Sequence, residues 1–460
     1  MGKGRTHRPE RDAAVCMSCG GCTWRCPATV FSGLRGEEGS LRGEIYRTRP
    51  FEGEVASEPP CVLACPLGQD VPGYVSAIAA GDLERAAETI RRTNALPSVC
   101  GRACLASCMR ACTRAGIDEG VDIRGLKRFA VVAAGSNDEE PAVPEAKDPP
   151  VAVIGAGPAG LAAAHRLAQL GRRAVVFDAE EIPGGSLADT VPSFVLPREH
   201  LAADVERLER LGVSFRTGTR VGRDVAWEEV EEGYGAIIVA TGARRGFVPE
   251  AAGDYPEGVV SAPAFCRGAG VDGRRIEGPV VVSGGGFAAL QSARVALRLG
   301  AKTASVVHPA PAEQWPAGAD AIGEASAEGV RILDMHRVTA LSSEDGRLAG
   351  VDVKAVKASS PDAVDRHSLA SYGKAERLEA SWFVGAVERR PAPQDPPRVD
   401  GVGFGVIGNL RTDSGFSLGR DGWFACGEAA TGAATIVDSM GTGRLAAEAV
   451  DRYLGTGGAR

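Results

Sequence analysis

The fold of this chain is decided by the stretch Val151-Ala-Val-Ile-Gly155-Ala-Gly157-Pro-Ala-Gly160. A short Val/Ile run leads through a Gly-x-Gly-x-x-Gly turn into the Ala- and Leu-rich run 161–170. Glycines at this spacing permit a tight turn and let a pyrophosphate approach the N-terminus of the following helix. Asp178, at the end of the next Val-rich run, can accept hydrogen bonds from ribose hydroxyls. The motif predicts a strand–turn–helix unit that binds a dinucleotide; the alternative is an ordinary glycine turn.

A second glycine turn, in Val280-Val-Val-Ser-Gly284-Gly-Gly286-Phe-Ala-Ala289, opens the helical run 290–299. From residue 151 onward, short Val/Ile runs alternate with Ala/Leu/Arg runs, which indicates βαβ units and a parallel sheet. The C-terminal stretch from Gly422 to Ala447 is typical of the completion of the first nucleotide fold. We therefore expect one Rossmann-like domain interrupted by a second.

Composition excludes several classes of protein. The chain has 460 residues, 44% of them apolar and 24% charged, which is typical of a globular protein of several domains. Its 52 basic and 59 acidic residues give a net charge of −7, which argues against a general nucleic-acid binder. No apolar run reaches the roughly 18–20 residues that span a bilayer, and the basic start lacks the apolar core of a secretory signal. We expect a cytoplasmic protein, in which disulfides are rare.

Ten of the 12 cysteines lie within the first 112 residues. Cys16, Cys19, Cys22 and Cys26, the last followed by a proline, have the spacing of a bacterial ferredoxin. Zinc is the alternative ligand for such Cys-x-x-Cys pairs. A second group comprises Cys61, Cys65, Cys100, Cys104, Cys108 and Cys112. Spacings of four would place the last four on one face of a helix. The remaining two, Cys266 and Cys426, are expected to be core residues.

Three further stretches favour FAD over NAD in the first nucleotide fold. Pro183-Gly-Gly185 follows the acidic strand end, and Val239-Ala-Thr-Gly242 is a strand that runs into a Thr-Gly turn. Ala425-Cys-Gly-Glu428 precedes a Gly-Ala-Ala-Thr435 helix start. A carboxylate at Glu428 would meet the ribityl or pyrophosphate part of the flavin, and the helix N-terminus would point at the flavin ring.

With these motifs the chain resembles the family of the small subunit of NADPH-dependent glutamate synthase, which includes the N-terminal half of dihydropyrimidine dehydrogenase. The resemblance extends upstream to Pro60-Cys-Val-Leu-Ala-Cys65-Pro66 and Asn94-Ala-Leu-Pro-Ser-Val-Cys100-Gly-Arg-Ala-Cys104, and covers about residues 59–456. It implies FAD, two [4Fe–4S] clusters and a nicotinamide cofactor. Cys61 and Cys112 would match ligands of one cluster and Cys65, Cys104 and Cys108 ligands of the other, whereas Cys100 would not be a ligand.

The chain departs from the family in both kinds of site. The Cys-x-x-Cys pair upstream of Cys61 is missing, and the early ferredoxin run is the candidate replacement. Lys127 stands where the family has a Gln or Glu ligand, and a protonated amine cannot bind iron. In the first nucleotide fold, Val195 replaces an arginine.

The second glycine loop has lost the residues that hold NADPH in the family. The next strand ends in Val306-Val-His308-Pro instead of Tyr-Arg-Arg, and Phe287 and Gln291 replace an Asn and an Asp. An NADPH site, an NADH site and a relict fold without a nucleotide all stay open. His308 is either a group that contacts a ribose or phosphate or a plain surface residue.

We expect no catalytic acid–base side chain. The expected cofactor-binding residues are Gly155, Ala156, Gly157, Pro158, Ala159, Gly160, Asp178, Gly185, Leu187, Thr241, Gly242, Glu428, Ala434 and Thr435 for FAD, and Gly284, Gly286, Ala289 and His308 for NAD(P)H. The expected cluster ligands are Cys16, Cys19, Cys22, Cys26, Cys61, Cys65, Cys104, Cys108 and Cys112.

The fold class expected is α/β, with an N-terminal helical iron–sulfur domain followed by two Rossmann-like nucleotide-binding domains, the second inserted in the first. The boundaries expected are a Cys-rich ferredoxin-like arm (1–58), a helical iron–sulfur domain (59–134), a linker (135–150), the first part of the FAD domain (151–262), an NAD(P)-binding-like domain (263–375) and the second part of the FAD domain (376–460). The function expected is that of an FAD-dependent oxidoreductase that exchanges electrons with a pyridine nucleotide and a redox partner. The alternative is an electron-wiring subunit of a larger complex with no NAD(P)H activity of its own.

Overall fold

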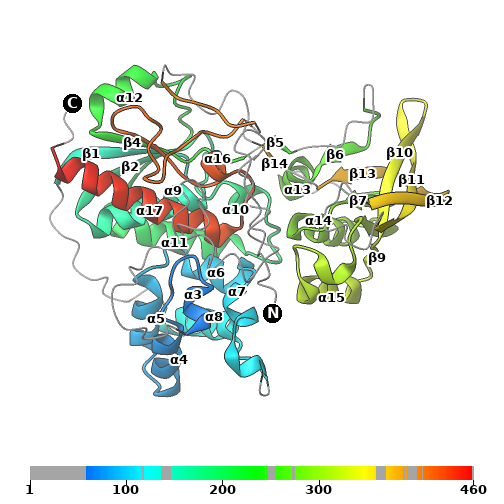
Figure 1. The fold of residues 1–460 in the computed structure, drawn as a ribbon, viewed down its shortest axis with the longest axis horizontal. Coiled ribbons are helices and arrows are strands. Elements are labelled where there is room, and N and C mark those ends of the chain that lie inside the picture. The colour runs from blue at the N-terminus through cyan, green and yellow to red at the C-terminus, as the bar shows by residue number, and fades with distance from the viewer. Residues whose placement is uncertain are drawn as a thin grey trace, which may run out of the picture.

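The computed structural model describes residues 59–116, 119–135, 147–243, 245–246, 255–271, 275–358, 369–386, 389–390, 401–406 and 408–457. The expected ferredoxin-like arm, with Cys16, Cys19, Cys22 and Cys26, lies outside the described residues. Figure 1 shows three parts: a base of short helices, a sheet domain above it, and a second sheet domain beside the first. Within the described ranges, no helix combines the length and the apolar character that crossing a membrane requires.

The first sheet domain is an all-parallel sheet in the order β15-β4-β1-β2-β3. Its strands are β1 (Lys147–Ile154), β2 (Arg172–Phe177), β3 (Ser214–Arg216), β4 (Ala236–Val239) and β15 (Trp423–Ala425). Its helices are α9 (Pro158–Gln169), α10 (Ser186–Asp189), α11 (Arg198–Arg210), α12 (Trp227–Gly233), α16 (Glu428–Thr431) and α17 (Ile436–Gly455). β1 starts at Lys147, inside the stretch expected to be a linker.

The helix of the first glycine turn, α9, packs directly against α17, although the two are far apart in the sequence (Figure 1). Their backbones cross so closely at Gly443 that a Cβ there would come within 2.1 Å of the Ala159 carbonyl oxygen. A residue with a side chain would push the helices apart. This crossing attaches the C-terminal helix to the start of the first nucleotide fold.

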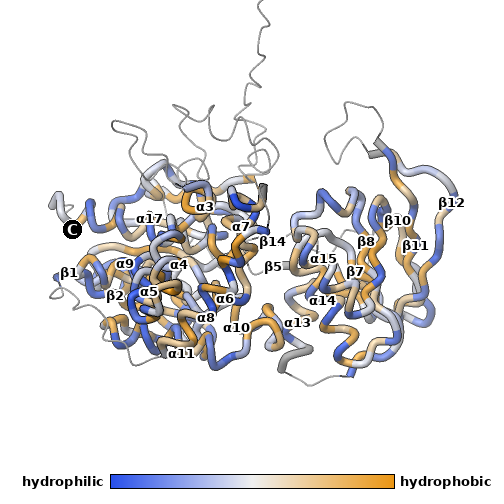
Figure 2. Tube along the Cα trace, turned by 90° about the horizontal axis from the view of Figure 1, so that it is seen from below, coloured by the Kyte–Doolittle hydropathy of each residue, from blue (hydrophilic) through white to orange (hydrophobic). Residues whose placement is uncertain are grey.

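The second sheet domain has a parallel sheet in the order β6-β13-β7-β8-β9. Its strands are β6 (Val259–Ser261), β7 (Pro279–Ser283), β8 (Thr303–Val307), β9 (Arg331–Leu333) and β13 (Trp382–Gly385). Figure 2 shows β7 and β8 as hydrophobic, in keeping with their buried side chains. The helices are α13 (Ala262–Val271), α14 (Phe287–Arg298) and α15 (Ala319–Ala327), with a 3₁₀ turn, η2, at Ala312–Gln314.

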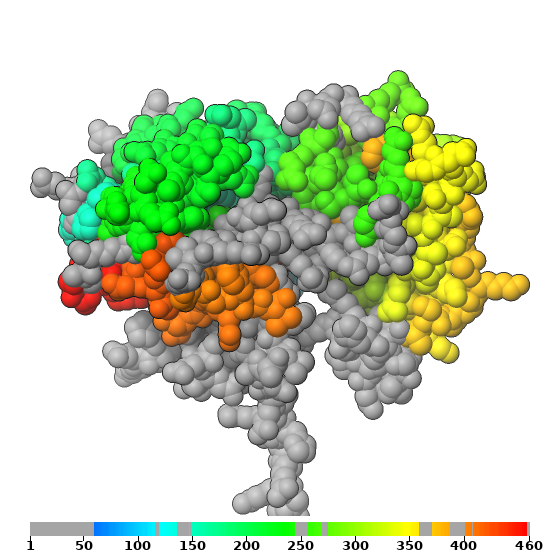
Figure 3. Space-filling model, turned by 90° about the horizontal axis from the view of Figure 1, so that it is seen from above, coloured from blue at the N-terminus to red at the C-terminus, as the bar shows by residue number. Residues whose placement is uncertain are grey.

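An antiparallel sheet of β10 (His336–Glu344), β11 (Arg347–Ala358) and β12 (Leu369–Glu379) covers the far side of the second domain. In Figure 3 the yellow surface of β10 and β11 lies at the end of the molecule opposite to α12, in green. A buried cluster that includes Val281, Val307, Val351 and Val353 joins this sheet to the parallel one.

The second domain is inserted in the first, as predicted. The chain leaves after β4 through β5 (Arg245–Gly246) and comes back through β14 (Arg389–Arg390), and these two segments pair with each other. It then adds β15 beside β4 and completes the first sheet. β6 (Val259–Ser261) pairs with β13 and therefore belongs to the second sheet. The inserted domain thus begins before residue 263, the boundary expected from the sequence.

The N-terminal base is helical, as predicted. Its elements are α3 (Pro60–Leu63), α4 (Val71–Ala79), α5 (Leu83–Arg91), α6 (Pro97–Ala103), α7 (Ser107–Arg110), the 3₁₀ turn η1 (Thr113–Gly116) and α8 (Ile123–Ala134). Asp70, Asp82 and Asp122 cap α4, α5 and α8, each accepting a hydrogen bond from a backbone amide of the first turn. The base therefore consists of short helices with well-defined starts.

The four cysteines from Cys100 to Cys112 do not share one helix face. α6 ends at Ala103, Cys104 is extended, and the backbone of Ala106 is left-handed with φ 51°. The spacing of four would give a shared face only within one continuous helix, and that condition is not met because the helical conformation is interrupted between α6 and α7. The turn brings Cys104 and Cys108 toward α3 and α8 instead.

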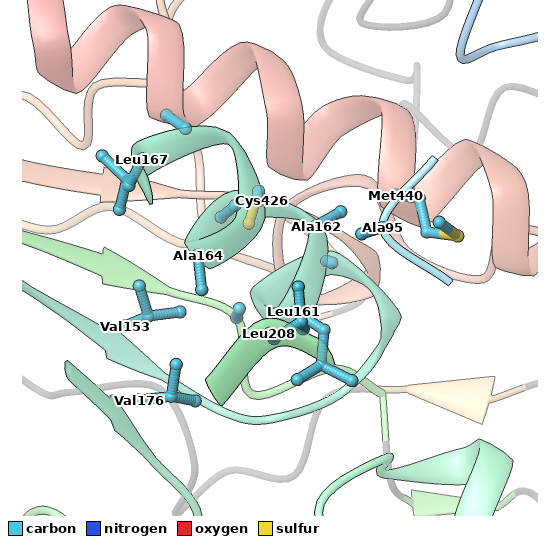
Figure 4. Close-up of a cluster of buried hydrophobic side chains, with 14 of the residues drawn as sticks. Ala95, Val153, Leu161, Ala162, Ala164, Leu167, Val176, Leu208, Cys426 and Met440 are labelled. Atoms are coloured by element: carbon cyan, nitrogen blue, oxygen red, sulfur yellow. The ribbon is translucent and has the colours of Figure 1, made fainter. Parts of the chain in front are cut away.

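The base and the first sheet domain share one hydrophobic core. Leu96, Val99 and Cys100 of the base are buried in the same cluster as Leu161 and Met440. Figure 4 shows Ala95 of the base beside Met440 of α17. The helical base is thus not a separate body on a linker.

One polar face of α11 holds the start of α6. The carboxylate of Asp204 accepts hydrogen bonds from the amides of Ser98, at 3.3 Å, and Val99, at 3.1 Å. The guanidinium of Arg207 donates to the Ala95 carbonyl oxygen at 2.8 Å. Asp204 thereby serves α6 as a cap supplied from another domain.

Replacing Asp204 with alanine is expected to cost about 1–3 kcal/mol of local stability, because two buried amides lose their acceptor. Hydrogen–deuterium exchange of the segment 96–104 measures this as a loss of protection. Unchanged protection would contradict the role assigned to Asp204.

The same contact predicts a dependence on pH. Burial raises the pKa of Asp204 to about 6, above its ordinary value of 3.8. Its linked contribution to stability is therefore fully present below the ordinary pKa and is lost as pH rises through about 6. Relative to Asp204→Asn, the wild-type segment should gain protection as pH falls from about 7 to about 5.

Candidate functional site

The first glycine turn and the start of α17 line a cleft. Ten of the expected FAD-binding residues line it: Gly155, Gly157, Pro158, Ala159, Asp178, Gly185, Thr241, Gly242, Glu428 and Ala434. Four others support the cleft from behind. Ala156 and Leu187 are fully buried, Gly160 packs against the Gly155 carbonyl, and Thr435 caps α17. The structure brings the expected flavin set together.

Asp178 fixes the glycine turn. Its Oδ2 accepts a hydrogen bond from the Ala156 amide at 2.6 Å, and its Oδ1 accepts one from the Glu180 amide at 2.8 Å. Gly155 has φ 114°, a conformation that favours glycine. The acidic side chain therefore lies in the cleft with its position set by the backbone on both sides.

The start of α17 is held by a capping box between Thr435 and Asp438. Glu428 Oε1 accepts a hydrogen bond from the Ala434 amide at 3.2 Å, which fixes the preceding turn. The N-termini of α9 and α17 both border the cleft, and helix N-termini favour anionic groups.

The cleft fits a dinucleotide in two respects. A Cβ added at Gly157 would meet no atom within 4 Å, so the backbone there faces open space. Thr241 Oγ1 is buried and has no hydrogen-bond partner among the described residues. Both observations are expected where a bound ligand supplies the missing contacts.

The sequence did not reveal that α13 of the inserted domain forms a wall of this cleft. Pro263 and Arg267 line it, and Arg267 Nη1 forms an ion pair with Asp189 Oδ2 of the first domain at 3.2 Å. Nearby, the guanidinium of Arg298 lies 4.1 Å from the centre of the Phe194 ring. These contacts join the two domains, and no local sequence motif predicts them.

The second glycine turn forms the expected strand–turn–helix unit between β7 and α14. Gly284 follows β7, Gly286 caps α14, and Ala289 is fully buried in its first turn. The ring of His308 is only 6% exposed, packs edge-on against Trp315 with ring centres 5.4 Å apart, and lies against Gly285. His308 is therefore not a plain surface residue.

Gln291 lies on α14 and is 3% exposed. Neither its side-chain oxygen nor its nitrogen has a hydrogen-bond partner in the described part of the chain. Gln291 stands where the resembled family has an aspartate, and no described residue forms a hydrogen bond with its side chain.

The cysteines of the base gather around the junction of α3, α6, α7 and α8. The thiols of Cys65, Cys104 and Cys108 interact electrostatically with one another, and the thiol of Cys61 interacts with both Cys112 and Cys65. Burial raises the pKa of the Cys104 thiol and raises that of Cys108 to about 12. These thiols would become thiolates only with a metal or another cation to stabilise them.

Cys100 lies in the core that the base shares with the first sheet domain, and its thiol also interacts electrostatically with Cys104 and Cys65. Its Sγ lies 3.8 Å from Met440 Sδ, and the side chain is 1% exposed within the shared core. Cys266 and Cys426 are buried, as predicted, and Cys266 Sγ lies 3.6 Å from Ser292 Oγ.

No three His, Cys, Asp or Glu side chains of the described ranges come together as ligands of a single metal ion. A single zinc ion holds its thiolates at about 2.3 Å, whereas a cubane separates its four thiolates by the body of the cluster.

Two family models match the chain. Residues 55–139 match dihydropyrimidine dehydrogenase domain II, a 4Fe–4S cluster domain, and residues 149–451 match the pyridine nucleotide-disulphide oxidoreductases. The first match covers the helical base, and the second covers both sheet domains.

Several curated proteins are similar over most of the chain. The beta subunit of the NADP(+)-dependent formate dehydrogenase of Moorella thermoacetica is 34% identical, over 86% of this chain and 60% of its own length. The beta subunit of the NADPH-Fe(3+) oxidoreductase of Geobacter sulfurreducens is 30% identical, over 86% of this chain and 64% of its own. The NADPH glutamate synthase small chain of Escherichia coli is 28% identical, over 89% of this chain and 93% of its own. The resemblance to the glutamate synthase small subunit is confirmed.

Solved structures share the fold of the two sheet domains. FprA, an oxidoreductase of Mycobacterium tuberculosis, aligns with a TM-score of 0.56 at 16% identity, over 67% of this chain and 86% of its own. Thioredoxin reductase of Lactococcus lactis aligns with a TM-score of 0.51 at 20% identity, over 67% of this chain and all of its own.

Replacing Gly157 with alanine is expected to leave the fold intact and to weaken FAD binding at least about tenfold, because the added Cβ occupies the space of the pyrophosphate. Gly286→Ala is the matched control, since Gly286 caps α14 in the equivalent turn and its Cβ would also meet no atom within 4 Å. Visible absorbance and FAD content of the purified proteins measure the effect. Equal FAD content in both variants would contradict the assignment.

Proposed function

The chain belongs to the pyridine nucleotide-disulphide oxidoreductase family and carries a 4Fe–4S domain in front of it, and from this premise we propose a specific electron route. The protein passes electrons between a pyridine nucleotide and a low-potential acceptor or partner subunit, through FAD and two [4Fe–4S] clusters.

The contact between Cys100 and Met440 carries this proposal. Met440 follows Ser439, which lines the flavin cleft, and Cys100 lies in α6, four residues before Cys104. The two sulfur atoms are 3.8 Å apart in a shared, water-free core. The flavin cleft and the cysteine group are therefore separated by a few packed side chains, which supports direct electron transfer between them.

In this proposal the first glycine turn and the N-termini of α9 and α17 hold the FAD, and Asp178 binds its adenosine ribose. FAD exchanges electrons in pairs or singly and a cluster exchanges them singly, so together they convert hydride transfer into single-electron transfer. Thr241 and Glu428 position the flavin, and Arg267 with Asp189 closes the cleft between the two domains.

Cys65, Cys104 and Cys108 are proposed as ligands of one cluster, and Cys61 and Cys112 as ligands of the other. Cys16, Cys19, Cys22 and Cys26 are proposed to supply the thiolates that complete these sets. The stronger interaction of Cys61 with Cys112 than with Cys65 supports the division into two centres.

A redox partner is part of the proposal. Two of the similar proteins are named as subunits, one of a formate dehydrogenase and one of an NADPH-Fe(3+) oxidoreductase. This chain spans only 60% and 64% of their lengths, so their acceptors do not transfer to it.

The second candidate is an electron-wiring subunit whose inserted domain binds no nucleotide. The buried ring of His308 against Gly285 favours this second candidate. That ring lies at the end of β8, where the related family has the arginines that hold NADPH. The intact turn from Gly284 to Ala289 favours the first candidate.

Anaerobic addition of NADPH or NADH distinguishes the two candidates. The first candidate predicts that one of them bleaches the visible flavin absorbance. No bleaching by either, together with full bleaching by dithionite, would support the wiring subunit and exclude the first candidate.

The ligand assignment predicts a difference between two neighbouring cysteines. Wild-type protein purified anaerobically should contain about eight iron and eight sulfide per chain, the content of two cubanes. Cys104→Ala should lose up to about half of both, whereas Cys100→Ala should keep them, because its sulfur packs against Met440. Loss of iron in Cys100→Ala alone would reverse the assignment.

A further inference from the structure

Lys127 is a buried cation in the middle of α8. The residue is only 6% exposed, although lysine carries a strongly hydrated charge. The helix α8 packs on α4, α5, α6 and α7, so the ammonium is enclosed by the base on several sides. A buried charge is stable only when an opposite charge or a set of hydrogen bonds compensates it.

The strongest electrostatic partners of this ammonium are all cysteines: Cys100, Cys65, Cys104 and Cys108. Neutral thiols are weak hydrogen-bond partners and carry no charge. Negative charge on the cysteine group would compensate the buried ammonium of Lys127. A cluster bound by thiolates supplies that charge.

Tyr74 is a second buried polar group that neighbours the same cysteines. Its side chain is fully buried in α4, and its hydroxyl has no hydrogen-bond partner among the described residues. Its strongest electrostatic neighbours are again cysteines, with Cys108 and Cys65 first. The Tyr74 hydroxyl is therefore available to donate a hydrogen bond to an anionic acceptor at these sulfurs.

The backbone adds a third donor. The amide of Ala106 donates a hydrogen bond to Cys104 Sγ at 3.4 Å, in the turn where Ala106 is left-handed. The ammonium of Lys127, the hydroxyl of Tyr74 and the amide of Ala106 thus all neighbour the cysteine group that includes Cys65, Cys104 and Cys108.

We propose that Lys127 is the buried counter-ion of an anionic iron–sulfur cluster at Cys65, Cys104 and Cys108, and that it raises the reduction potential of this cluster with the help of Tyr74. The inference rests on the proposed function, because it requires the cluster. Lys127 is a positioning residue for charge and not an iron ligand.

The physical argument is Coulombic. Reduction of the centre adds one electron, which comes from the flavin or an external donor, and forms or breaks no bond. The ammonium of Lys127 stabilises the more negative, reduced state more than the oxidised state. Net charge and hydrogen bonds to sulfur are the levers by which a protein sets the potential of such a centre.

The test uses Lys127→Met, which keeps the length of the side chain and removes the charge. Lys302→Met is the matched control, because Lys302 is an exposed lysine of the inserted domain. Iron and sulfide contents of the anaerobically purified, full-length proteins are measured first. An electron paramagnetic resonance titration with dithionite then gives the midpoint potential of each cluster signal.

At a fixed potential, Lys127→Met should show at least a tenfold lower ratio of reduced to oxidised cluster for one signal, which is a shift of about 59 mV for a one-electron couple. Lys302→Met should match the wild type. Tyr74→Phe should shift the same signal in the same direction by less. Full clusters with an unchanged or higher potential in Lys127→Met would overturn the inference.

Lys127→Arg covers the case in which Lys127→Met loses the cluster. Arginine keeps the charge and does not bind iron, so a retained cluster at the wild-type potential supports the counter-ion. Loss of the same cluster in both variants would overturn it in favour of an iron ligand or a purely structural lysine. Wild-type protein without iron and sulfide would instead refute the proposed function.

Discussion

The arrangement of this molecule depends on how α6 is seated between α11 and α17. Asp204 caps α6 from one side, and Met440 packs against Cys100 from the other. The helical base has a small core of its own, but α6 is buried in the core shared with the first sheet domain, so side-chain packing fixes where its cysteines lie relative to the flavin cleft. A short, dry and rigid path of this kind is what electron transfer between two centres needs, and a flexible linker would not provide it.

The same packing explains why charge matters so much in the base. Water is excluded from the region of Lys127 and Tyr74, so each polar group there has to be matched by another. In a water-filled site the departure from the family at residue 127 would be a minor change. In the proposed role of Lys127 as a counter-ion, the same departure would change the electrostatic balance of the whole cysteine group.

Local sequence patterns predicted most of the architecture. The turn from Gly155 to Gly160, the start of α17 at Thr435 and the insertion were all readable, because glycine spacing and capping are set by neighbours in the sequence. The wall formed by Pro263 and Arg267 was not, and neither was Tyr74, because both depend on contacts between distant segments. The interruption of the helix between Cys100 and Cys112 was not predictable either, because an alanine at position 106 gives no signal of a left-handed backbone.

The wall that α13 builds has a consequence for how such a chain evolves. The two ends of the inserted domain meet where β5 pairs with β14, so the domain is a self-contained module that the host sheet does not need for its own closure. Its deletion would nevertheless uncover the cleft on the side of Arg267. Selection would therefore retain the inserted domain as a cover for the flavin even in a lineage where that domain no longer bound a nucleotide. The turn from Gly284 to Ala289 would then persist after the nucleotide-binding arginines had been lost.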